Sequence, residues 1–162
     1  MGDSGKLYAG FEKDFPIAMR ELCKAADFIL PNHTEACLLS DMPYPSNGNE
    51  LLSALKKITS RPIITGVEEE NETAVYASDF NNSVLRLGRP TTQGFFCGSG
   101  DVFASAFVGA IAVGIDYEKA VKIATEFTTA CIQRSAIEVP DHRYGLSFEK
   151  ELPLLMKLVG KI

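Results

Sequence analysis

A short apolar run meets the start of a predicted helix in the stretch Ala26-Asp27-Phe28-Ile29-Leu30-Pro31-Asn32-His33-Thr34-Glu35-Ala36. We interpret residues 28–30 as a buried strand that ends at Pro31, because strands covered on both faces in a parallel sheet are continuous apolar runs. Thr34 could cap the short helix that follows. A strand that passes directly into a helix is the unit from which α/β folds are built.

Apolar spacing extends this alternation along the chain. The predicted elements, in chain order, are loop over most of 1–13, a helix over about 15–26, the strand at 28–30, a helix over about 51–58, a strand at 62–65, two extended segments at about 73–78 and 83–87 that form a hairpin, and helices over 101–113, from 117 onward and over about 147–159. Residues 101–113 are apolar around most of the helix, which predicts that this helix is buried. These elements indicate an α/β fold with a largely parallel sheet.

The composition is that of an ordinary globular protein and excludes several classes of function. Among 162 residues, 46% are hydrophobic and 23% are charged, which excludes a disordered chain. The 16 Lys and Arg residues against 21 Asp and Glu residues give a net charge of −5, so we expect no nucleic-acid partner. The longest apolar runs fall far short of the roughly 18 residues of a membrane span, so we expect no membrane partner.

The cysteines and the first residues predict a reducing compartment. Cys23, Cys37, Cys97 and Cys131 include no Cys-x-x-Cys pair, and the two histidines are far apart, so a structural zinc site is not expected. The opening residues Met1-Gly2-Asp3-Ser4-Gly5-Lys6 lack the apolar segment of a signal peptide. We therefore expect a cytoplasmic protein with reduced thiols.

The strongest local signal for chemistry is Cys97-Gly98-Ser99-Gly100-Asp101, at the start of the helix predicted over 101–113. Two glycines around a serine allow backbone N–H groups to point at one spot, and the helix N-terminus adds partial positive charge, which suits a phosphate group. Asp101 beside such a site is explained if its carboxylate takes a proton from a hydroxyl that attacks the phosphate. The alternative is that Ser99 and Asp101 merely cap the helix and the glycines form a turn.

Two further candidate sites follow the predicted strands, where ligands bind in open α/β sheets. Asn32 and Glu35 lie three residues apart after the first strand. Their oxygen atoms suit Mg²⁺, which keeps most of its waters and uses few protein ligands. Thr65 and Gly66 end the second strand, where a hydroxyl and an open backbone could contact a phosphate. The alternatives are a helix cap at Asn32 and a simple turn at Gly66.

Three segments together carry a resemblance to a known enzyme family: Met1-Gly2-Asp3-Ser4-Gly5-Lys6-Leu7-Tyr8, Ala26 to Ala36 as quoted above, and Gly98-Ser99-Gly100-Asp101-Val102-Phe103. In this order and spacing the chain resembles the pyridoxal/pyridoxine kinases of the ribokinase-like superfamily, which have the hydroxymethylpyrimidine kinases as close relatives. Members of this family are usually nearly twice as long, and the chain resembles only their C-terminal half. The resemblance implies a single partial kinase domain over residues 1–162, with a three-layer α/β/α ribokinase-like fold.

The resemblance also implies an activity, the ATP-dependent phosphorylation of the hydroxymethyl group of a B6 vitamer (pyridoxal, pyridoxine or pyridoxamine) to the 5′-phosphate. The alternatives are a hydroxymethylpyrimidine (phosphate) kinase of thiamine synthesis and a truncated, non-catalytic nucleotide-binding remnant. The absent half would supply the vitamin-binding pocket, so we expect weak or no vitamin kinase activity from this chain alone. An open sheet edge and core would remain exposed, which leads us to expect a homodimer.

Individual roles carry over from the family to the matching positions of this chain. The resemblance implies that Asp101 is the general base, that the backbone of Gly98, Ser99 and Gly100 forms an anion hole, that Asp3, Asn32, Thr65 and Gly66 contact the nucleotide, that Glu35 helps to hold Mg²⁺, and that residues 84–89 and 127–132 wall the adenine. Leu30 stands where these kinases often have Thr, which leaves a K⁺ requirement open.

Overall fold

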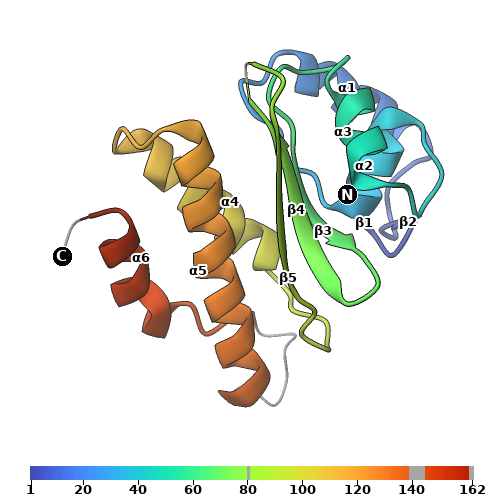
Figure 1. Cartoon of the computed structure of the whole chain (residues 1–162). Coiled ribbons are helices and arrows are strands. Elements are labelled where there is room, and N and C mark those ends of the chain that lie inside the picture. Colours follow the sequence, from blue (N-terminus) through green and yellow to red (C-terminus); the bar gives the residue numbers. More distant parts are fainter. Residues whose placement is uncertain (80, 139–144, 161–162) are drawn as a thin grey trace. The chain divides into compact units, whose positions relative to one another are not determined.

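The computed structural model describes residues 1–79, 81–138 and 145–160, and these divide into two compact units, Met1–Gly88 and Arg89–Ile162 (Figure 1). In chain order the elements are β1 (Gly2–Asp3), β2 (Lys6–Leu7), α1 (Phe15–Lys24), α2 (His33–Ser40), α3 (Gly48–Leu55), β3 (Ile63–Glu68), β4 (Glu72–Ser78), β5 (Val84–Pro90), α4 (Ser99–Ala112), α5 (Tyr117–Glu138), the 3-10 turn η2 (Glu149–Glu151) and α6 (Leu152–Leu158).

The first unit is built on a three-stranded sheet with the order β3-β4-β5. Strands β3 and β4 are antiparallel, with Ile63 opposite Ala77 and Glu68 opposite Thr73. The predicted hairpin over β4 and β5 is confirmed as a pair of neighbouring strands, and its Asp79 carboxylate accepts hydrogen bonds from two amides of the turn. A second, two-stranded antiparallel sheet pairs β1 with β2, where the sequence predicts loop. Ser4 and Gly5 both have positive φ, as a tight two-residue hairpin turn requires.

Within the described ranges, parallel pairing is limited to two isolated bridges, Ile29 with Pro62 and Asn32 with Thr65. The backbone N–H of Ile63 donates to the carbonyl of Ile29 over 2.9 Å. The N–H of Thr65 donates to the carbonyl of Pro31 over the same distance, 2.9 Å. In a regular parallel ladder the amide of residue 31 would donate back to β3, but proline has no N–H. The largely parallel sheet that the sequence predicts is therefore not found among the described residues.

Helices α2 and α3 pack on one face of the three-stranded sheet and form the core of the first unit (Figure 1). The core includes buried apolar side chains from both helices and from β3 and β4, namely Ala36, Cys37, Leu39, Leu51, Leu52, Leu55, Ile64, Val67, Ala74 and Tyr76. Helix α3 begins three residues earlier than its apolar spacing predicts, with Asn47 as its N-cap. Gly48 is required there, because a Cβ atom at this position would lie 2.5 Å from the Tyr76 ring.

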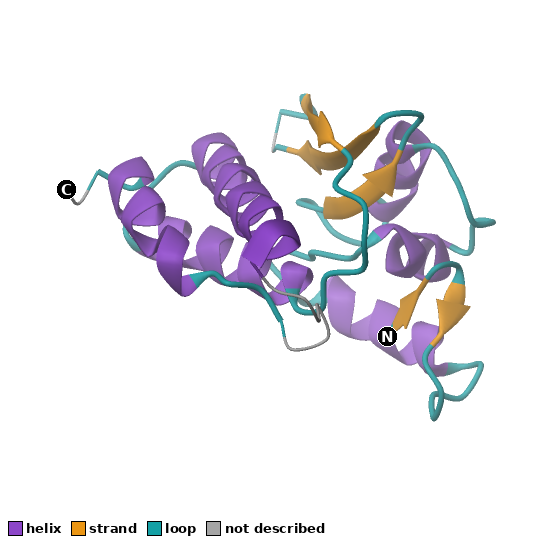
Figure 2. Ribbon diagram, turned by 90° about the horizontal axis from the view of Figure 1, so that it is seen from below, coloured by secondary structure: helices purple, strands orange, loops and turns teal. Residues whose placement is uncertain are grey.

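Apart from the end of β5, the described residues of the second unit form helices joined by loops, as Figure 2 shows. Helices α4 and α5 pack against each other, and the rings of Phe107 and Tyr117 meet edge to face at 6.0 Å. Asp116 precedes α5, and its carboxylate accepts a hydrogen bond from the amide of Lys119 over 3.0 Å. Helix α4 is not buried all round, because Val108 is 56% exposed in this chain.

No helix within residues 1–79, 81–138 and 145–160 has both the length and the apolar character that crossing a bilayer requires.

The core of the first unit yields a stability prediction. Leu55 is fully buried, whereas Leu22 on α1 is 65% exposed. Leu55→Ala should lower the free energy of unfolding by about 2–5 kcal/mol, since it removes packed atoms and leaves a cavity. Leu22→Ala should change the free energy of unfolding by no more than about 0.5 kcal/mol. Urea unfolding of both variants measures the difference, and equal effects would contradict this assignment of the core.

Candidate functional site

Asn32 and Glu35 form a capping box at the start of α2. The Asn32 side-chain oxygen accepts from the amide of Glu35 over 2.8 Å, and Glu35 Oε2 accepts from the amide of Asn32 over 3.0 Å. Asn32 is thus the N-cap, and the prediction of Thr34 as the cap is wrong. Asn32 is the cap instead of Thr34 because its extended backbone places the side-chain oxygen over the N3 amide. The capping alternative for this motif is therefore confirmed.

The same motif holds the first residues of the chain. The side-chain amide of Asn32 donates to the carbonyl of Gly2 over 2.9 Å, and Glu35 Oε1 forms an ion pair with the amino group of Met1. Thr34 Oγ1 accepts from the amide of Gly5 over 2.9 Å. These contacts attach the β1–β2 hairpin to the start of α2. The candidate residue Asp3 directly follows Gly2, which Asn32 contacts.

Thr65 and Gly66 form a β-bulge in β3. Ile64 pairs with Tyr76 and Val67 pairs with Ala74, so β3 advances by one residue more than β4 between the two pairs. Gly66 has φ +67°, a backbone conformation that glycine adopts without strain. Thr65 in turn bridges to Asn32. The first unit therefore gathers five predicted site residues, which are Asp3, Asn32, Glu35, Thr65 and Gly66.

The donor set of this site can be tested against a Mg²⁺ ion. Both carboxylate oxygens of Glu35 have a protein partner, but each has two lone pairs and can also accept from a water molecule. Of the described residues, no group of three His, Cys, Asp or Glu side chains could hold a metal ion. A Mg²⁺ ion at this site would therefore be bound mainly by water and by ligand phosphates, and Glu35 would reach it through water.

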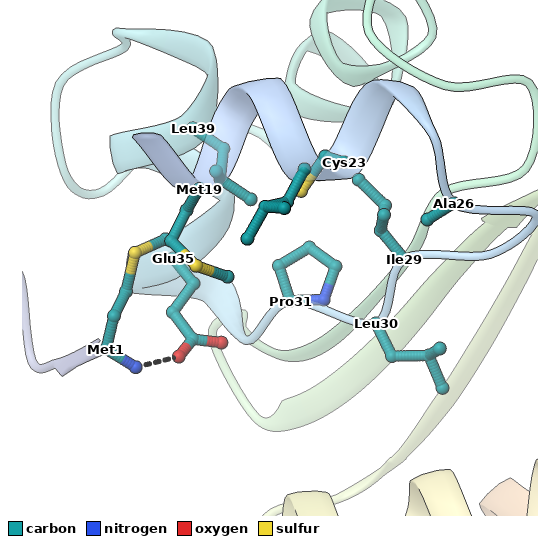
Figure 3. A pocket seen from close by; sticks show the side chains of 10 residues that line it. Met1, Met19, Cys23, Ala26, Ile29, Leu30, Pro31, Glu35 and Leu39 are labelled. Atoms are coloured by element: carbon teal, nitrogen blue, oxygen red, sulfur yellow. Dashed lines mark hydrogen bonds and ion pairs between the residues drawn. The ribbon is translucent and has the colours of Figure 1, made fainter. Parts of the chain in front are cut away.

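An apolar pocket of about 310 Å³ lies beside the motif (Figure 3). Its lining residues are Met1, Met19, Leu22, Cys23, Ala26, Ile29, Leu30, Pro31, Glu35 and Leu39. The Glu35 carboxylate and the Met1 amino group are the charged groups in this lining, and they are paired with each other. Because its two charged groups are paired and the rest of the lining is mainly apolar, this pocket suits a phosphate poorly.

In the second unit the start of α4 presents open backbone amides. Gly98 is the N-cap, with φ +79°, and no side chain caps the helix. The amide of Ser99 bonds to the carbonyl of Phe96 over 3.4 Å, while those of Gly100 and Asp101 have no partner among the described residues. Of the alternative, side-chain capping by Ser99 or Asp101 is therefore not found, whereas a turn at Gly98 is confirmed by its positive φ. A helix N-terminus with unpaired amides is suited to bind an anion.

Asp101 lies in the first turn of α4 and is exposed. It has no hydrogen-bond or ion-pair partner in the part of the chain that the structure describes. Its carboxylate is therefore free to accept a proton from a bound molecule. Gly100 is also surrounded by open space, since a Cβ atom at this position would meet no protein atom within 4 Å. The space above this turn is open.

The four cysteines differ in their environment, and all are free thiols. Burial raises the pKa of Cys23 and Cys37 and raises the pKa of Cys131 to about 11. Cys97, directly before the Gly98 cap, is only partly buried. Three thiols are thus packing groups, and the fourth lies at the open end of α4.

Comparison with known proteins now decides the family. A model of the phosphomethylpyrimidine kinase family matches residues 10–145. The chain belongs to this family. The matched residues include both the start of α2 and the start of α4, so the candidate residues from Asn32 to Asp101 all lie in the part that this family model matches. No curated protein matches the chain.

Solved structures of kinases share the fold of this family member. Pyridoxal kinase from Lactobacillus plantarum is 29% identical with a TM-score of 0.86, over 98% of this chain and 59% of that chain. A protein from Bacteroides thetaiotaomicron, described as a phosphomethylpyrimidine kinase and crystallised with pyridoxal, is 33% identical with a TM-score of 0.85, over 96% and 58%. Pyridoxal kinase from Leishmania donovani in complex with ADP and pyridoxamine is 25% identical with a TM-score of 0.77, over 96% and 55%.

These matches confirm the resemblance to pyridoxal kinases and their pyrimidine-kinase relatives, and the α/β class of the fold. The chain spans less than two thirds of the length of these relatives. The three-layer arrangement, the single-domain assignment and the roles of the individual site residues stay predictions.

Sequence reasoning missed the β1–β2 hairpin, which carries Asp3 to the start of α2. A signal was present, because Ser4-Gly5 is a dipeptide typical of tight turns. It also missed the bulge at Gly66, although an isolated glycine inside a strand pattern is a known sign of one. No local pattern marked the contact between Thr34 and Gly5, since it joins residues far apart in sequence.

The thiol environments predict selective alkylation. Iodoacetamide at pH 8 should label Cys97 first in the folded chain, because only thiolates react and burial keeps Cys131 protonated and inaccessible. Peptide mass spectrometry locates the label, and Cys97→Ser should remove the fast phase. Labelling of Cys131 at the rate of Cys97 without denaturant would contradict this structure of the second unit.

Proposed function

We propose that this chain provides the phosphate-handling part of an ATP-dependent kinase that phosphorylates the hydroxymethyl group of a B6 vitamer to the 5′-phosphate. The observation that carries the proposal is the bare start of α4, where the amides of Gly100 and Asp101 are unpaired beside an exposed carboxylate. Support for the substrates comes from the related structures, one determined with pyridoxal and another with ADP and pyridoxamine.

In the proposed reaction Asp101 is the general base. The vitamer hydroxyl oxygen attacks the γ-phosphorus of ATP, its proton passes to the Asp101 carboxylate, and the bond from the γ-phosphorus to the ADP oxygen breaks. The amides at the Gly98–Asp101 turn donate to the phosphoryl oxygens and stabilise the charge that develops on them. Because these donors are fixed by the helix, they need no reorganisation during the transfer.

Residues of the first unit have the complementary task in this proposal. Asp3, Asn32, Thr65 and Gly66 contact the nucleotide, and Glu35 helps to position Mg²⁺. When bound, Mg²⁺ neutralises charge on the ATP phosphates. Glu35 and Asn32 suit this task because the capping box fixes both side chains at the start of α2. A homodimer and a cytoplasmic location remain part of the proposal.

A hydroxymethylpyrimidine (phosphate) kinase is the second candidate. The matching family model and the related protein from Bacteroides thetaiotaomicron are both named for phosphomethylpyrimidine, although that protein was crystallised with pyridoxal. The same base and anion hole serve either acceptor, because both carry a primary hydroxyl. A third candidate, a nucleotide-binding remnant without catalysis, keeps the anion hole but makes no phosphorylated product.

Gly100→Ala tests the anion site. Its Cβ atom meets no protein atom within 4 Å, so folding is not obstructed, and alanine favours the helix by about 0.5–1 kcal/mol. The methyl group should instead obstruct the phosphate, and we expect the MgATP affinity to fall at least about tenfold, equivalent to 1.4 kcal/mol. Titration calorimetry measures the affinity and thermal melting measures the stability.

The matched control is Gly109→Ala in the middle of α4, whose Cβ atom also has open space. It should raise helix stability in the same way and leave MgATP affinity unchanged. Equal affinities of the two variants for MgATP would place the phosphate elsewhere.

Asp101→Asn separates chemistry from binding. The variant keeps the shape of the side chain but cannot accept the proton, so phosphorylated product should fall about 10²–10⁴-fold. MgATP affinity should be equal or higher, since a negative charge next to the phosphates is removed. Mass spectrometry of the products from pyridoxal, pyridoxine and hydroxymethylpyrimidine also identifies the acceptor. Glu118→Gln, an exposed charge on α5, is the control, and turnover of Asp101→Asn within tenfold of the wild type would exclude this base.

A further inference from the structure

The bulge at Gly66 determines which residues of β3 face the core of the first unit. Ile64 and Val67 are both buried, at 0% and 2% exposure, although they are three positions apart. In a regular strand, residues an odd number apart lie on opposite faces. Because the bulge adds one residue to β3, Val67 lies on the same face as Ile64 and its partner Tyr76. Glu69, two residues after Val67, falls on that face as well. Glu69 can therefore meet Tyr76 only while the bulge is present.

The hydroxyl of Tyr76 closes this arrangement. It donates to Glu69 Oε1 over 2.5 Å, and its ring packs against Gly48 at the start of α3. Tyr76 is opposite Ile64, just before the bulge, and Glu69 directly follows the end of β3 at Glu68, so the hydrogen bond joins positions on the two sides of the bulge. The Tyr76 side chain is 3% exposed, so its hydroxyl has little access to water as an alternative partner.

Arg86 on β5 holds the acceptor in place. Its guanidinium forms ion pairs with the carboxylates of Glu69 and Glu72. The hydrogen bonds from Arg86, and then that from Tyr76, lower the pKa of Glu69, so this carboxylate is ionised at neutral pH. The ion pairs are partly exposed to solvent, whereas Tyr76 is buried, so the hydrogen bond from the Tyr76 hydroxyl to the Glu69 carboxylate is the part that fixes the position of the strand.

We infer that Tyr76 and Glu69 are positioning residues for the nucleotide site, because their hydrogen bond locks the Gly66 bulge that holds Thr65 against Asn32. The inference rests on the proposed function, in which Thr65 contacts the nucleotide. The link between lock and site is the amide of Thr65, which donates to the Pro31 carbonyl over 2.9 Å, directly before Asn32. If the bulge slips, this amide and the bridge to Asn32 are the first contacts to move.

Tyr76→Phe removes only the hydroxyl and tests the lock in the full chain. Hydrogen exchange at the Thr65 amide should become at least about fivefold faster, and MgATP affinity should fall by about the same factor. Tyr117→Phe, the same deletion in the second unit, should leave Thr65 exchange and MgATP affinity unchanged. Exchange at Thr65 that is unaltered by Tyr76→Phe would overturn the inference, as would faster exchange with unaltered MgATP affinity.

Two substitutions of Glu69 distinguish this hydrogen bond from a general effect on stability. Glu69→Ala should reproduce the loss of Thr65 protection and of MgATP affinity. Glu69→Gln keeps an oxygen for the Tyr76 hydroxyl and should restore both, although it loses the ion pair with Arg86. Equal losses in the two variants would overturn the role of Tyr76. If the wild type binds no MgATP, the proposed function fails, and Thr65 exchange alone still decides whether the lock holds the bulge.

Discussion

The hydrogen bond from the Thr65 amide to the Pro31 carbonyl is the constraint on which the first unit depends. It joins the segment 29–32 to β3 at Pro31, the residue before Asn32, which is the N-cap of α2. On one side of it the Asn32–Glu35 capping box sets the direction of α2 and holds the β1–β2 hairpin. On the other side the Gly66 bulge sets the register of β3 with β4. The residues around this hydrogen bond therefore determine both the local fold of the first unit and the positions of its candidate site residues.

Much of the fold was predictable because helices and hairpins are encoded by local spacing. The helices around α1, α3 and α4, the start of α5 and the β4–β5 hairpin were all predicted close to their observed bounds. The sheet was less predictable, since strand direction depends on partners distant in the sequence. Pro31 was interpreted only as the end of a strand, yet its missing N–H also limits the parallel ladder. Residues 1–8 were predicted as loop because two-residue strands leave no periodic pattern.

The candidate site was likewise predictable where local sequence patterns encode it and not where it depends on distant residues. Gly98 to Asp101 could be found from sequence, because the glycine spacing directly describes a bare helix start, and the structure shows that no side chain caps it. For Asn32 and Glu35, sequence left a cap and a metal site as alternatives, and the structure shows the cap. A residue can serve both purposes, since the lone pairs used by the backbone are not the only ones on a carboxylate. Sequence could not reveal Tyr76, whose importance comes from a register shift on the neighbouring strand.

The two glycines at the start of α4 are under different constraints during evolution. Gly98 has φ +79° and is needed for the turn itself, so it would be retained even in a copy of the gene that had lost its ligand. Gly100 has ordinary helical geometry and open space around it, and folding alone would favour alanine there. A lineage freed from phosphate binding should therefore fill position 100 first and keep position 98. Under the proposed function, the residue at position 100 would therefore mark which members of this family still use the helix start, and it can be read from their sequences alone.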